Sequence, residues 1–139
     1  MLVGLLVVSV TLGISFAAAF AAPGDWAQLG YGAAHNGYQR DETVLDRTTV
    51  RGLARAYAVR IGPAGTPVVV GGTIYVTIQA QKDLLVAMAA NDGSVLWERE
   101  LDSGAVEFTP AVANGIVYIT SQRYTSPDHG GSVYAFDAS

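Results

Sequence analysis

The sequence contains no cysteine among its 139 residues. That absence excludes a disulfide framework, cysteine metal sites, iron–sulfur clusters, a catalytic thiol and a lipid-modified cysteine. Lys82 is the only lysine, and the formal net charge at pH 7 is −4. Such a chain lacks the basic field that nucleic acid or anionic lipid attracts, so we expect neither as a partner.

Charged side chains are missing from the N-terminal end, where Asp25 is the first. Residues 1–22 are apolar and include Ala19-Phe20-Ala21, the small-x-small pattern that signal peptidase recognises. We therefore expect residues 1–21 to form a signal helix that is cleaved after Ala21, which makes the protein extracytoplasmic, either periplasmic or secreted. The alternative is an uncleaved anchor, because about 20 apolar residues can span a bilayer.

The remaining chain is rich in hydrophobic residues, which make up 50% of the sequence against 14% charged residues, so we expect an ordered core. It also repeats itself. Residues 66–77 align with 109–120 at a spacing of 43, and residues 85–90 align with 133–138 at a spacing of 48. The second copy has five extra residues, which fall within 121–131. A further echo aligns residues 56–61 with 96–101.

Each copy is predicted to consist of strands joined by tight turns. Gly71-Gly72 and Asn114-Gly115 occupy equivalent places between β-branched runs, and both pairs suit the positive φ values of a type I′ hairpin. Asn91-Asp92-Gly93 supplies the next turn. The strands expected in the first copy are Pro67–Val70, Thr73–Gln79, Leu84–Ala89 and Ser94–Leu101.

Four-stranded units at a period of about 40 residues predict an all-β fold, a β-propeller, because each blade buries its faces only against neighbouring blades. The organisation that follows is a signal peptide (residues 1–21), a leader with a ring-closing strand (22–62) and propeller repeats (63–139). About two blades are present, and the second is incomplete.

One motif identifies the type of repeat. Ala87, Gly93 and Trp97 match the tryptophan docking motif of the pyrroloquinoline-quinone-like (PQQ-like) repeat family, Ala-x-Asp-x-x-Thr-Gly-x-x-x-Trp. The second copy retains Ala135 and Asp137 and stops before its glycine and tryptophan. The chain thus resembles the PQQ-like propellers, and the resemblance gives these five residues a structural docking role. The glycine permits the turn and the tryptophan buries a large ring against a neighbouring blade.

The segment before the repeats resembles the leader of the same family, through Asp25–Gly30, Asn36-Gly37-Tyr38, Leu53 and Tyr57. In this family eight blades usually close a ring, with a terminal strand completing the last blade. The resemblance implies that Leu53–Ile61 is that strand and that the chain is the N-terminal part of a longer protein. A chain cut there would expose unpaired strand edges and apolar faces.

The family contains both enzymes and binding proteins. Quinoprotein dehydrogenases hold PQQ and calcium on the propeller axis, whereas other members, such as the scaffold lipoprotein of the outer-membrane barrel-assembly machinery, only bind partners. The alcohol dehydrogenases place a vicinal Cys-Cys pair and Asn-Arg-Gly after the first docking tryptophan, and a quinone-contacting Glu three residues before the first inner-strand proline. Residues 98–110 contain neither element, and Ala64 stands at the Glu position.

We therefore expect a non-catalytic binding or assembly scaffold for a protein or extracellular ligand, with no cofactor. The alternative is the N-terminal part of a PQQ- and calcium-dependent dehydrogenase of alcohols or sugars, and a further option is a sensor domain fused to another domain. No nucleophile elbow, phosphate loop, HExxH pair or dinucleotide fingerprint is present.

The candidate binding loop is the five-residue expansion, because loops over a propeller face are where ligands meet the scaffold. It contains Arg123, Tyr124, Asp128 and His129. A solvated connection is the competing interpretation. His35 is expected to be a loop residue with ordinary hydrogen bonds.

Two charged clusters in the leader are expected to be structural. Asp41, Glu42 and Asp46 lack the dense alternation of oxygen ligands of a calcium loop, so a solvated turn is favoured. The arginines at 47, 51 and 55 could form a stripe on a short helix, but Gly52 interrupts it.

Along the second strand, Thr73, Tyr75 and Thr77 alternate with three aliphatic residues and should lie on the opposite face of the blade. Tyr75 and its equivalent Tyr118 are expected to bury their rings in the core, with their hydroxyls near polar edges.

Overall fold

The structure is a computed structural model that describes residues 24–101, 108–122 and 130–139. Within them the chain forms β-strands and one short 3₁₀ helix, η1 (Thr49–Gly52), which confirms the predicted all-β fold. In these residues no helix is long and apolar enough to cross a membrane. The expected signal helix, residues 1–21, lies outside the described residues.

The first sheet is antiparallel and has four strands in chain order. They are β1 (Val68–Val70), β2 (Thr73–Ile78), β3 (Asp83–Ala89) and β4 (Val95–Leu101). Each lies within one residue of its predicted bounds. We call this sheet blade one.

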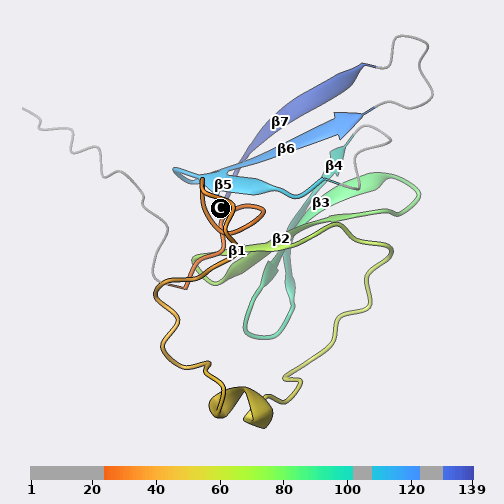
Figure 1. Cartoon of the computed structure of the whole chain (residues 1–139). Coiled ribbons are helices and arrows are strands. Elements are labelled where there is room, and N and C mark those ends of the chain that lie inside the picture. Colours follow the sequence, from red (N-terminus) through yellow and green to blue (C-terminus); the bar gives the residue numbers. More distant parts are fainter. Residues whose placement is uncertain (1–23, 102–107, 123–129) are drawn as a thin grey trace, which may run out of the picture.

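The second sheet, blade two, contains β5 (Ala111–Ala113), β6 (Ile116–Gln122) and β7 (Gly131–Asp137). Its three strands are antiparallel and in chain order. Figure 1 shows the two sheets packed face to face, and they approach each other most closely at their first strands, β1 and β5.

The two predicted hairpin turns have the expected backbone conformation. Gly71 and Gly72 have φ values of 57° and 76°, and Asn114 and Gly115 have φ values of 51° and 73°. Two consecutive positive φ values define a type I′ turn, which suits the twist of the flanking strands. The register of each hairpin follows from its turn, since Val70 pairs with Thr73 and Ala113 with Ile116.

The core between the blades comes from one face of each sheet. Blade one supplies Val68, Tyr75, Leu85, Ala87 and Leu101, and blade two supplies Val117 and Ile119. All of these side chains are at most 4% exposed. Their burial is the main source of stability for the pair of sheets, at about 25 cal/mol per Å² of apolar surface.

The alternation predicted along β2 is confirmed, because Tyr75 belongs to the core between the blades and Val76 and Ile78 belong to a second cluster on the opposite face. For Tyr118 the expectation of burial is wrong, since that side chain is 42% exposed. It points away from blade one, and no further blade covers that face in the described residues.

The leader forms a long arc that starts beside β1 and β5 and carries η1 away from both sheets (Figure 1). The helix ends at Gly52, as the sequence predicted. Leu53–Ile61 has no strand assignment in the structure. Its proposed pairing with a final blade stays a prediction, because that blade is not among the described residues.

Candidate functional site

The docking residues of blade one lie side by side on β3 and β4. Ala87 is fully buried and pairs directly with Trp97, whose ring packs against the core between the blades. The Trp97 ring lies 5.8 Å from the Tyr75 ring, and the Arg99 guanidinium carbon lies 5.0 Å from the Trp97 ring centroid. A small residue at 87 leaves room for these aromatic rings.

Gly93 has φ 76° and lies against the leader. A Cβ atom placed there would lie 2.9 Å from Cε2 of Tyr57 and would also collide with Val59. The Tyr57 hydroxyl donates to the carbonyl oxygen of Ala90 at 2.8 Å. The glycine is therefore required twice, by the backbone conformation and by the close approach of the leader.

Tyr57 and Trp97 are equivalent positions in the sequence echo. Each places an aromatic ring beside a neighbouring element, Tyr57 on blade one and Trp97 in the core shared with blade two. The leader thus makes with blade one the kind of contact that the outer strand β4 makes with blade two.

The second docking copy lies at the end of β7. Ala135 and Asp137 are exposed, and Asp137 accepts hydrogen bonds from the backbone N–H and hydroxyl of Ser139, which lower the pKa of its carboxyl. The adjacent carbonyl of Ala138 accepts a hydrogen bond from the Tyr75 hydroxyl at 2.9 Å. Burial raises the pKa of that hydroxyl, which stays a donor at neutral pH. This bond links the two blades directly.

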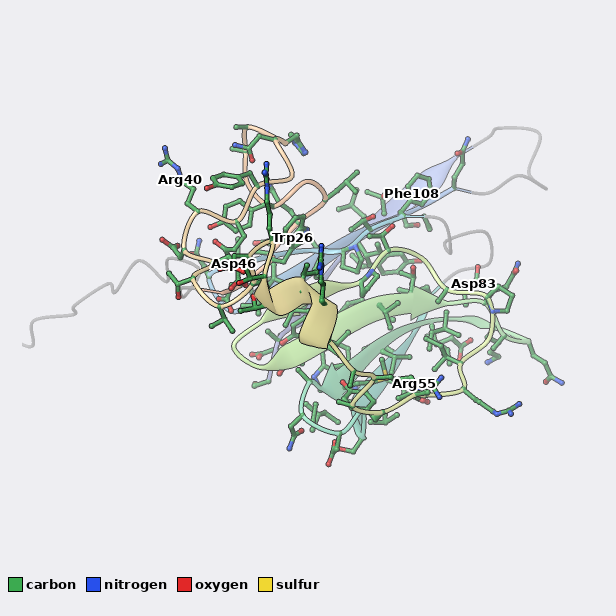
Figure 2. The ribbon with its side chains drawn as sticks, turned by 60° about the horizontal axis from the view of Figure 1, so that its bottom comes forward. Trp26, Arg40, Asp46, Arg55, Asp83 and Phe108 are labelled. Atoms are coloured by element: carbon green, nitrogen blue, oxygen red, sulfur yellow. The ribbon has the colours of Figure 1, made fainter. Side chains whose placement is uncertain are left out.

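The inner edges of the two blades are bonded to the leader. The backbone of Trp26 exchanges two hydrogen bonds with Val69, of 2.7 Å and 3.0 Å, and the carbonyl of Ala27 accepts a bond from the N–H of Val112 at 2.8 Å. Consecutive leader residues therefore bind β1 and β5. Figure 2 shows Trp26 among the side chains where the leader meets the sheets.

One comparison decides the family. The family profile described as outer membrane protein assembly factor BamB matches residues 38–139, which are most of the chain. The chain belongs to the BamB family of PQQ-repeat proteins. No curated protein and no solved structure matches the chain significantly.

Membership of the BamB family makes the two sheets successive blades of a partial β-propeller. Ala64 has no side-chain donor or acceptor. The backbone N–H of Gly65 donates to Thr77 of β2, and the carbonyl of Pro63 accepts from the N–H of Gln79, which directly follows β2. The outward backbone groups of Val69 are bonded to the leader.

The candidate binding loop of this BamB-family chain cannot be placed, because Arg123, Tyr124, Asp128 and His129 lie outside the described residues. Its flanks are defined by the pairing of Gln122 with Gly131. His35 is exposed in a leader turn, where its Nδ1 lies 2.8 Å from the carbonyl oxygen of Leu29. It has the ordinary hydrogen bond expected of it.

The acidic residues of the leader shape its turns. Asp46 accepts hydrogen bonds from the hydroxyl and N–H of Thr48 and from the N–H of Thr49, and these bonds lower the pKa of Asp46 to about 2. Glu42 accepts from the N–H groups of Val44 and Leu45, which lowers its pKa. Among the described residues no group of acidic or histidine side chains could hold a metal ion.

The arginines do not form a stripe on one helix. Of the three spaced at intervals of four, only Arg51 lies on η1. Figure 2 shows Arg55 on the leader beyond one end of this helix and Asp46 near the other.

The sequence analysis missed two contacts. The first is the set of backbone hydrogen bonds from the leader to β1 and β5, and the second is the packing of Tyr57 against Gly93. The first has no side-chain signature, because backbone groups make it. The second had a signal, the alignment of residues 56–61 with 96–101, which places Tyr57 at a docking position.

Proposed function

We propose that this BamB-family chain belongs to an exported, non-catalytic propeller that serves as a binding or assembly scaffold for protein partners. The export rests on the apolar segment 1–21 with its cleavage pattern. The scaffold role is supported by the family, whose profile bears the description of an outer membrane protein assembly factor.

One structural observation carries the proposal beyond the family. In a cofactor-binding propeller, polar groups on the inner strands face the axis and hold the ligand. Here the inner strands are short and apolar, with the sequences Val68–Val70 and Ala111–Ala113. Their backbone groups at Val69 and Val112 are bonded to the leader. These two strands therefore carry no polar side chain with which to hold a cofactor, which supports the proposal.

The test is a titration of the full-length mature protein with PQQ and Ca²⁺, followed by thermal unfolding and absorbance. A ligand that binds only the folded state stabilises it by about 2.7 kcal/mol at a concentration one hundred times its dissociation constant. We expect no rise in melting temperature and no dye-linked oxidation of alcohols or sugars, with a known quinoprotein dehydrogenase as the positive control.

A rise in melting temperature together with substrate oxidation would contradict the proposal and make the protein a dehydrogenase. Ala64→Glu is the matched variant, since it restores the carboxylate found in the alcohol dehydrogenases. We expect it to leave the titration unchanged, because the neighbouring backbone is already bonded to β2.

A further inference from the structure

The inference concerns residues Asp25–Ala27, which we call the leader strap. The strap lies along the free edge of β1, where Trp26 forms an antiparallel bridge with Val69. Its next residue, Ala27, accepts a hydrogen bond from β5. A single tripeptide therefore contacts both blades at the place where they converge.

An uncovered strand edge can cause unwanted pairing between chains. A free edge presents unpaired N–H and C=O groups that can pair with a strand from another chain. Val69 would present both groups and Val112 one donor if the strap were absent, because these are the groups bonded to Trp26 and Ala27. The strap satisfies them within the chain.

Asp25 is placed to hold the strap in register. Asp25 is 8% exposed, and its Oδ1 accepts a hydrogen bond from the N–H of Gly71 at 2.9 Å. Gly71 is the first residue of the turn that follows β1. The carbonyl of Asp25 also accepts from the Gln39 side chain at 3.2 Å, which ties the strap to the rest of the leader.

We propose that the leader strap is an in-chain strand addition that closes the inner edges of blades one and two, and that Asp25 is its positioning residue. A partner strand can then add to these edges only by displacing the strap. The proposal is independent of whether the propeller is a scaffold or an enzyme.

The experiment is amide hydrogen exchange on the full-length protein, resolved at Val69 and Val112. In Asp25→Ala we expect exchange at these two amides to quicken by about tenfold or more, with β2 and β3 unchanged. Asp25→Asn should behave like the parent, because its amide oxygen still accepts from Gly71. Asp41→Ala is the exposed control.

Trp26→Pro tests the strap without changing Asp25, because proline lacks the N–H that bonds to Val69. If Asp25→Ala does not fold, the exchange rates of Trp26→Pro test whether the strap protects Val69 and Val112. A synthetic peptide with the sequence of residues 24–31 should restore slow exchange to Asp25→Ala. Parent-like exchange rates at Val69 and Val112 in both variants would overturn the claim that the strap protects these edges. If the peptide fails to restore slow exchange, the claim of strand addition is overturned.

Discussion

At the scale of single residues, Tyr75 links the two blades through its ring and its hydroxyl. The residue is 3% exposed, its ring lies beside Trp97, and its hydroxyl donates a hydrogen bond to the carbonyl of Ala138 in the other blade. Burial of a large ring and one hydrogen bond between blades make this position sensitive to both size and polarity.

We expect Tyr75→Ala to lower the free energy of unfolding of the full-length protein by about 3–5 kcal/mol, because it leaves a cavity in the core. Tyr75→Phe should cost about 1 kcal/mol, since it removes only the hydrogen bond. Urea denaturation measures both. Tyr38 is 62% exposed, so Tyr38→Ala is the matched control. Equal costs for the Tyr75→Ala and Tyr38→Ala variants would refute the packing.

Asp46 gives a prediction for acid pH. Its pKa falls from 3.8 to about 2 because it accepts hydrogen bonds in the folded leader. A lowered pKa means that the turn is stabilised above pH 3.8 and loses this contribution as the pH falls through about 2. NMR titration of the carboxyl should show this midpoint, and Asp46→Asn should remove the transition from the Thr48 and Thr49 amides. A midpoint near 3.8 would contradict the turn geometry.

At the scale of elements, the strands and hairpins were predictable because their signals are local. Paired turn residues and period-two alternation fixed β1 to β4 to within a residue. The leader strap was not predictable, because a bond between the backbones of Trp26 and Val69 leaves no side-chain pattern. Burial at Tyr118 could not be read from its likeness to Tyr75, since the neighbouring sheet decides it.

Because the leader packs against blade one at Gly93, we predict that alanine substitution costs more stability at Gly93 than at Gly71. Gly71 and Gly93 both have positive φ, but a Cβ at Gly71 meets open space whereas one at Gly93 meets Tyr57. Gly71→Ala should cost about 1–2 kcal/mol from backbone strain alone. Gly93→Ala should cost about 1–3 kcal/mol more from overpacking.

Thermal unfolding of both glycine variants measures this difference. In a Tyr57→Ala background the excess cost of Gly93→Ala should shrink, because the colliding ring is gone. An excess that persists unchanged there would show that the leader does not rest on this turn.

At the scale of the whole molecule, the two blades differ in what covers their equivalent faces. Leu85 and Ala87 are fully buried in blade one, whereas their equivalents Val133 and Ala135 are exposed, with Val133 at 76%. In blade one this face of the repeat is buried, so we expect a further blade to cover the same face of blade two. The resemblance identified the family because several weak motifs agreed, and it left the partner open because no motif specifies one.

Cysteine labelling tests this account most directly, because residues 1–139 contain no cysteine that would react alongside an introduced one. In the full-length protein we expect Val133→Cys to react with a thiol reagent about tenfold or more slowly than Val44→Cys, which lies on the leader at 73% exposure. The same pair in the isolated residues 24–139 should react at similar rates. Rapid labelling of Val133→Cys in the full-length protein would contradict the claim that these sheets are two blades of a larger propeller.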